Sequence, residues 1–178
     1  NFEYFRGALD DVLSRFIEAA NHHGVTHIIR VGGDDPLIDP DACRYVKKIH
    51  LEQDGDFLYA SNRDGWPYGC ACELMSVDAL KDIRKKTDDE LYLEHIVPWF
   101  YDHPNDYKIN KISAPEEICR PTYYFSVDYP EDIELIRRIF RELKSKGDYF
   151  SMRDVVELCD ESQEILKVNK HLHSGFDH

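Results

Sequence analysis

Two aspartates, Asp34 and Asp128, occupy similar settings far apart in the sequence, and their chemistry suits a metal. Asp34 follows the apolar run 28–31 and a pair of glycines, and Asp128 follows the apolar run 123–127. In each case a proline suited to the first position of a helix comes soon afterwards. Carboxylates that converge from two strand ends can hold Mg²⁺, which prefers oxygen ligands and shares substrate phosphates. The pattern predicts a magnesium site at Asp34 and Asp128, although the Gly-Gly-Asp-Asp-Pro segment alone is equally typical of a surface turn.

Other residues could bind a substrate near such a site. Gly33 allows a sharp turn and the close approach of a ligand. The turn-forming segment 61–69 is a candidate substrate loop, in which Arg63 could bind an anion and Trp66 a ring, although exposed connectors have the same composition. His95 lies inside an apolar segment and could be a ligand or a base, whereas a half-buried structural histidine is the more common case.

The elements that must position these residues alternate between strands and helices. Apolar spacing of three and four residues predicts a helix from about Leu9 that stops at Gly24, and Asp39 predicts the cap of a helix from about Pro40 to Gln53. Further helices are expected to begin at Ser76, Pro130 and Ser151, and short strands are expected at 2–5, 28–31, 57–59, 70–75, 107–112 and 123–127. Strand-helix-strand order favours parallel pairing. The predicted fold class is α/β, with a mostly parallel sheet flanked by helices.

Two expectations concern side-chain burial in the last third of the chain. The helix from Pro130 is expected to bury four apolar residues, namely Ile133, Ile136, Phe140 and Leu143. The histidines near the end, His171, His173 and His178, are expected to be frayed surface residues.

Composition limits the classes of function. The formal net charge of −13 excludes the basic face that nucleic acids and anionic membranes require. The five cysteines are scattered without zinc spacing, which favours reduced thiols and a cytoplasmic location. No apolar run is long enough to span a bilayer. With 178 residues and no linker, a single domain over 1–178 is expected.

Several collinear segments between Arg6 and Asn169 together resemble one known family. They are Phe5 to Phe16, Arg30 to Pro40, Pro67-Tyr68-Gly69 with Glu73, Glu94-His95-Ile96-Val97-Pro98, Ser126 to Asp132, and Val168-Asn169-Lys170. The chain resembles the cytidylyltransferases of the spore-coat polysaccharide type, which are similar to CMP-Kdo and acylneuraminate cytidylyltransferases. The resemblance implies a Rossmann-like nucleotide-diphospho-sugar transferase fold. It also implies activation of a sugar acid by CTP, which gives a CMP-sugar and pyrophosphate, and a homodimer.

The same resemblance assigns roles to individual residues. Asp34 and Asp128 match the aspartates that bind Mg²⁺ and take part in catalysis in the CMP-Kdo branch. The arginines Arg6, Arg15, Arg30 and Arg63 are candidate contacts to phosphate or carboxylate groups. Gly69 and Glu73 fall in the sugar-side segment, where a carboxylate can accept hydrogen bonds from sugar hydroxyls.

The chain departs from the family pattern at four positions and in its extent. Ala8, Asp35, Leu93 and Tyr124 stand where serine, cysteine, arginine and arginine are usual. The family also begins with a strand and a loop that wraps the CTP triphosphate, and the sequence from Asn1 onward starts after that segment. We therefore expect the sequence to be the C-terminal part, about two-thirds to three-quarters, of the family's domain. The first part would belong to a longer protein or be a separate or cleaved piece.

Two other functions remain open at this stage. A metal-dependent glycosyltransferase or sugar-1-phosphate nucleotidyltransferase would use Asp34 and Asp35 to bind the diphosphate of a nucleotide sugar. A non-catalytic remnant with an assembly or regulatory role would account for the missing triphosphate loop and for the two replaced arginines.

Overall fold

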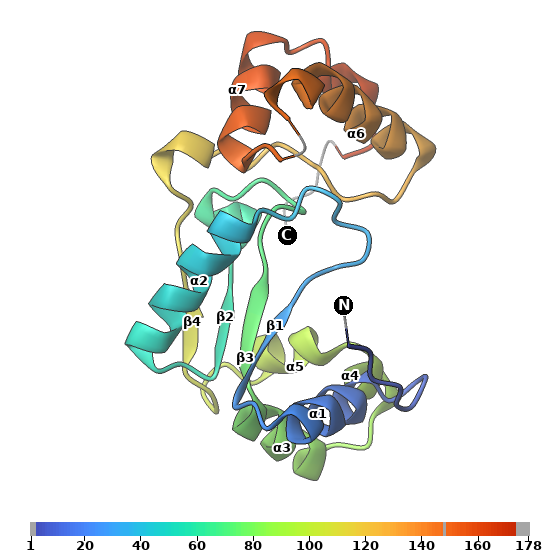
Figure 1. The fold of residues 1–178 in the computed structure, drawn as a ribbon. Helices are drawn as coiled ribbons and strands as arrows, with labels where there is room; N and C mark the ends of the chain where they lie inside the picture. Colours follow the sequence, from blue (N-terminus) through green and yellow to red (C-terminus); the bar gives the residue numbers. More distant parts are fainter. Residues whose placement is uncertain (1–2, 148, 174–178) are drawn as a thin grey trace. The chain divides into compact units, whose positions relative to one another are not determined.

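The computed structural model describes residues 3–147 and 149–173, and it alternates short strands with helices (Figure 1). The strands are β1 (His27–Arg30), β2 (Phe57–Tyr59), β3 (Glu73–Ser76) and β4 (Ile109–Lys111). The helices are α1 (Val12–His23), α2 (Pro40–Gln53), α3 (Val77–Lys86), α4 (Glu90–Glu94), α5 (Ile96–Asp102), α6 (Pro130–Leu143) and α7 (Met152–Glu161).

The chain divides into two compact units, which are described separately. Unit 1 holds the described residues of 1–30, 50–58 and 73–110, and unit 2 holds those of 31–49, 59–72 and 111–178.

The sheet has the strand order β1-β3-β2-β4 and is mixed rather than mostly parallel. β1 and β3 pair antiparallel, with His27 opposite Ser76 and Arg30 opposite Glu73. The Ser76 N–H donates to the carbonyl of Asp56, so the end of β3 lies beside the start of β2. The carbonyl of Lys108 accepts from the N–H groups of Asp56 and Phe57, so the start of β4 also lies beside the start of β2. The expectation of parallel pairing is wrong for β1 and β3. β2 and β3 also run in opposite directions, because the segment between them contains no crossover helix and parallel neighbours require one.

Local sequence signals explain the helices of unit 1. The Asp11 side chain accepts from the Ser14 N–H at the start of α1, and Gly24, with φ of +65°, ends it. Ser76 caps α3 in the same way through the N–H of Ala79. These helices group together in Figure 1, where α1 packs against α3 and α4. In the same unit, the rings of Phe57 and Phe100 stack with centroids 4.4 Å apart.

Unit 2 contains α6 and α7, which lie side by side in Figure 1. Ser151 and Asp154 form the predicted capping box of α7. The buried Asp39 carboxylate accepts from the N–H of Asp41 in α2 and from that of Met152 in α7, and so it caps two helices. Trp66, fully buried, donates from its indole nitrogen to the carbonyl of Ile112 over 2.7 Å.

Three expectations about unit 2 are wrong. The segment 123–127 is not a regular strand, because within the described part of the chain its ladder contacts are limited to an isolated parallel bridge between Tyr68 and Tyr124. In α6, Ile133 and Phe140 are 40% and 46% exposed, because the buried stripe runs through residues 132, 135, 136, 139 and 143, one position around the helix. His173 is not frayed, since its side chain is 5% exposed.

Further expectations concern the termini and the segment 91–101. Residues 3–5 are not a strand, and residue 2 lies outside the described residues, as does His178. His171 is exposed as expected. The apolar segment 91–101 is divided between α4 and α5, with His95 at the junction.

All five cysteines are free thiols. In the described ranges, no helix is long and apolar enough to cross a membrane.

Candidate functional site

Asp34 and Asp128, both in unit 2, lie on segments that contact each other directly. The N–H of Val127 donates to the carbonyl of Asp34 over 2.9 Å, and the Ser126 hydroxyl approaches the same oxygen at 3.5 Å. Both aspartates are exposed. Segments that carry exposed aspartates 94 positions apart along the chain are thus joined by a backbone hydrogen bond.

Asp34, Asp35 and Asp128 are called the aspartate cluster below. Two glycines make room for its acids. A Cβ on Gly32 would lie 2.4 Å from Asp34 Oδ1 and 2.4 Å from Asp35 Oδ2. At Gly69, φ is +82° and a Cβ would lie 2.7 Å from the Ser126 amide nitrogen and 2.9 Å from Asp35 Oδ1. The backbone therefore approaches these carboxylates more closely than any other residue type would allow.

Tyr124 binds the second aspartate from within the core. Its hydroxyl donates to Asp128 Oδ2, and its ring is buried. The Tyr68 ring stacks on it at a centroid distance of 4.6 Å and the His173 ring at 3.5 Å. Burial, and then the hydrogen bond to Asp128, raises the pKa of Tyr124, so the phenol remains protonated and able to donate.

A buried carboxylate, Asp132, fixes the backbone around Asp128. The side chain of Asp132 is 1% exposed and accepts from the N–H groups of Asp128 and Tyr129 over 3.0 and 2.9 Å. Its other oxygen contacts Asn169 Nδ2 and His173 Nε2, each at 2.8 Å. Burial alone would raise the pKa of Asp132, but these hydrogen bonds outweigh burial and hold it below its ordinary value.

The predicted residues of unit 1 form a separate set. Arg30 donates from Nη1 to Glu73 Oε2 over 2.5 Å, so the predicted phosphate contact and the predicted sugar contact are paired with each other. Arg15 donates to the carbonyl of Ala8, and the Arg6 guanidinium lies 5.6 Å from the ring centroid of Tyr4. His95 is exposed.

The remaining predicted residues belong to unit 2. Arg63 is exposed in the short 3-10 turn η1 (Asn62–Asp64). Gly33 is also exposed, and a Cβ there would meet none of the described atoms within 4 Å. Gly69 touches the aspartate cluster, as described above. The structure therefore brings Asp34, Gly69 and the segment of Asp128 together, and it brings Arg30 together with Glu73.

The donor set suits Mg²⁺ if a substrate supplies the other ligands. Asp34 and Asp128 are exposed and offer carboxylate oxygens, and the absence of a side chain at Gly32 makes room for the carboxylate of Asp34. Among the described residues, no group of three or more histidine, cysteine or acidic side chains is placed to hold a metal. A cation at these two aspartates would complete its shell with water and phosphate oxygens.

The sequence patterns missed several residues that shape this cluster. They are Tyr68, Asp132, Asn169 and His173. Asp132 had a local signal, because it stands three residues after the helix cap Tyr129, where an acid can close a capping box. The contacts of Asn169 and His173 join positions about forty residues apart, and no local pattern indicates them.

Comparisons with known proteins find several chains that are similar to this one. A family model described as cytidylyltransferase matches residues 1–153. The spore coat polysaccharide biosynthesis protein SpsF of Bacillus subtilis (strain 168) is 30% identical over 148 residues, which are 83% of this chain and 60% of that protein. The uncharacterized protein MJ1063 of Methanocaldococcus jannaschii is 26% identical over 170 residues, which are 94% of this chain and 67% of that protein.

A solved structure is similar to this chain in its fold. The structure of a cytidylyltransferase from Leptospira borgpetersenii serovar Hardjo-bovis (strain JB197) matches with a TM-score of 0.80 and 25% identity, over 91% of this chain and 67% of that chain. The predicted α/β nucleotidyltransferase fold is confirmed. The chain spans 60% of SpsF and 67% of the other two proteins.

Proposed function

Because the chain belongs to the cytidylyltransferase family, we propose that it transfers the cytidylyl group of CTP to a sugar acid. The sugar hydroxyl oxygen bonds to the α-phosphorus of CTP while the bond from that phosphorus to the bridging oxygen of the β-phosphate breaks. Pyrophosphate leaves with the bonding electrons, and the hydroxyl proton passes to solvent. The product is a CMP-sugar, which would serve the synthesis of a polysaccharide or surface glycan.

The observation that carries this proposal is the contact between the segments of Asp34 and Asp128. A hydrogen bond from Val127 to Asp34 holds the two segments together, and both carboxylates are exposed. In this proposal Asp34 and Asp128 bind Mg²⁺. The metal would neutralise charge on the α-phosphate and orient the attacking hydroxyl.

The chain's other residues have supporting roles in the proposal. The open backbone at Gly33 lets a phosphate approach closely. Arg63, exposed in the same unit, balances part of the phosphate charge, which an acidic protein must supply locally.

Pyrophosphate release tests the reaction. The assay uses CTP, Mg²⁺ and a sugar acid such as Kdo or N-acetylneuraminate, with the chain alone and with any segment that precedes it. We expect release only when all three are present. If neither form binds CTP or releases pyrophosphate, the proposal fails and an assembly or regulatory role remains. Stabilisation by UDP- or GDP-sugars instead of CTP with Mg²⁺, in a thermal-shift assay, would contradict it in favour of glycosyl transfer.

Asp128→Asn tests the role of the second aspartate. The carboxylate is exposed and placed for ligation rather than packing, so turnover should fall by more than about 100-fold while the unfolding midpoint changes little. Asp88→Asn is the control, because Asp88 is an exposed acid of unit 1 that pairs with Arg84, and it should turn over normally. Normal turnover in Asp128→Asn would remove Asp128 from the mechanism.

A further inference from the structure

The ring of Tyr124 is stacked against two other rings. The Tyr68 ring is inclined to it by 7° and the His173 ring by 10°, at centroid distances of 4.6 and 3.5 Å. Two nearly parallel rings this close cannot share one face of a phenol, so they cover opposite faces. The Tyr124 ring is therefore sandwiched, and its hydroxyl is directed at Asp128 Oδ2.

His173, on one face of the Tyr124 ring, is held by Asp132, which also binds the backbone of Asp128. Asp132 contacts His173 at 2.8 Å through one oxygen, and through the other it accepts from the N–H of Asp128. Asn169 ties this arrangement to Tyr124 as well, because its amide donates both to Asp132 and to the Tyr124 carbonyl. The main chain and the side chain of Asp128 are thus both held by one connected set of residues.

The contact matters because Asp128 is otherwise exposed. An aspartate carboxylate on the surface can rotate about its terminal torsion, and ordering it when a ligand binds costs free energy. A hydrogen bond from a fixed phenol removes that freedom beforehand. The phenol is also neutral, whereas the arginine that the family resemblance predicts at this position would offset the charge of the carboxylate.

We propose that Tyr124 is a positioning residue for nucleotidyl transfer. By donating to Oδ2 it fixes the rotation of the Asp128 carboxylate and leaves Oδ1 to a divalent cation, with the negative charge of the group intact. Tyr68 and His173 contribute by holding the phenol in place. This inference rests on the proposed function, because it assumes that Asp128 binds the metal.

Tyr124→Phe is the test, because it removes the hydroxyl and keeps the stacked ring. Supporting hydrogen bonds to metal ligands typically change metal affinity or activity by about 10–100-fold. We expect the affinity for Mn²⁺ in the presence of CTP and without sugar, measured by electron paramagnetic resonance, to fall by about 10-fold or more. The turnover number should fall with it, while the unfolding midpoint stays near that of the unmodified protein.

Tyr123→Phe is the matched control. The neighbouring Tyr123 is equally buried and donates its hydroxyl to the carboxylate of Asp160, away from the aspartate cluster. Its variant should bind Mn²⁺ normally. Equal losses in both variants would overturn the inference, because any missing phenol–carboxylate hydrogen bond would then produce them.

Asp128→Asn separates this inference from the proposed function. If Asp128→Asn abolishes Mn²⁺ binding and Tyr124→Phe leaves it unchanged, only the role of Tyr124 is overturned. If Asp128→Asn itself binds Mn²⁺ and turns over normally, the proposed function fails and the inference fails with it.

Discussion

At the residue scale, Gly69 is where backbone conformation and the carboxylate cluster constrain each other. Its positive φ disfavours any side chain, and a Cβ would press on the amide of Ser126 and on Asp35. An alanine there could be accommodated only if the backbone moved away from these neighbours. Because Ser126 is two residues before Asp128, such a movement would also disturb the proposed metal site.

We expect Gly69→Ala to lower the free energy of unfolding by more than about 1 kcal/mol. Urea unfolding followed by circular dichroism measures this change. The control is Gly33→Ala, because Gly33 has a negative or extended φ and open space around it among the described residues. The control should be neutral or slightly stabilising. If both substitutions lower the free energy of unfolding by the same amount, the close contact at Gly69 has no destabilising effect of its own.

At the element scale, helix ends follow local sequence closely in this chain. Asp11, Ser76 and Ser151 each accept a backbone N–H in the first turn of a helix, as their residue types predict. The buried faces are less local. In α6 the apolar periodicity indicated the helix correctly but misplaced part of its buried face, because the stripe that packs includes the carboxylate of Asp132.

Ser151→Ala tests the capping box of α7. Removing the hydroxyl leaves the N–H of Asp154 without its cap, and we expect a loss of about 1 kcal/mol in the free energy of unfolding. Denaturant titration gives the value. Ser145→Ala is the control, since Ser145 is an exposed serine in the short turn after α6, and its replacement should change the stability by less than about 0.5 kcal/mol. Equal effects would exclude a specific capping contribution.

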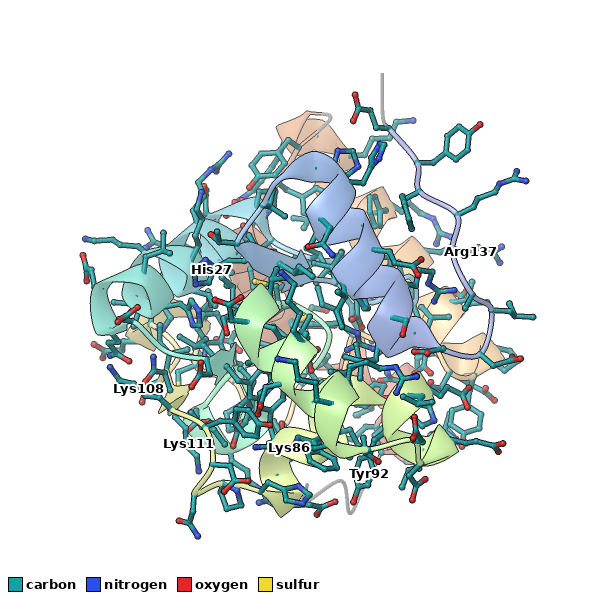
Figure 2. The ribbon with its side chains drawn as sticks, turned by 90° about the horizontal axis from the view of Figure 1, so that it is seen from below. His27, Lys86, Tyr92, Lys108, Lys111 and Arg137 are labelled. Carbon is teal, nitrogen blue, oxygen red and sulfur yellow. The ribbon has the colours of Figure 1, made fainter. Side chains whose placement is uncertain are left out.

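At the scale of the whole molecule, a buried histidine links stability to pH. His50, in α2, is fully buried, and neither of its ring nitrogens has a hydrogen-bond partner among the described residues. Its ring meets that of His27, which is labelled in Figure 2, edge to face at a centroid distance of 5.4 Å. Burial, and then the charge of His27, lowers the pKa of His50, while Asp56 and Asp54 act in the opposite direction.

The sign of the resulting pH dependence follows from linkage. Above about 6.5, the ordinary histidine pKa, His50 is neutral in the folded and the unfolded chain alike. As the pH falls below that value the unfolded chain takes up a proton that the folded chain resists, so stability decreases until the lowered pKa is reached. In His50→Leu we expect the thermal unfolding midpoint to fall less steeply as the pH is lowered. His171→Gln, which changes an exposed histidine, should retain it, and an unchanged slope in His50→Leu would contradict the assignment.

The sequence by itself determined the family, the α/β class and most helix boundaries, and it supplied the hypothesis that two aspartates bind a metal. Caps, glycine stops and apolar spacing act within a few residues, so local pattern is enough to predict them. The convergence of the Asp34 and Asp128 carboxylates on one cation stays a prediction, and the structure adds that their segments are joined by the hydrogen bond from Val127 to Asp34.

Only the tertiary structure decided how distant segments pair. It made β1 and β3 antiparallel, reduced the expected strand at 123–127 to one bridge, and buried His173 against Tyr124 and Asp132. Each outcome depends on partners far apart along the chain. The free energy of such contacts comes from burial and hydrogen bonding within the assembled fold, and this has no counterpart in local residue spacing.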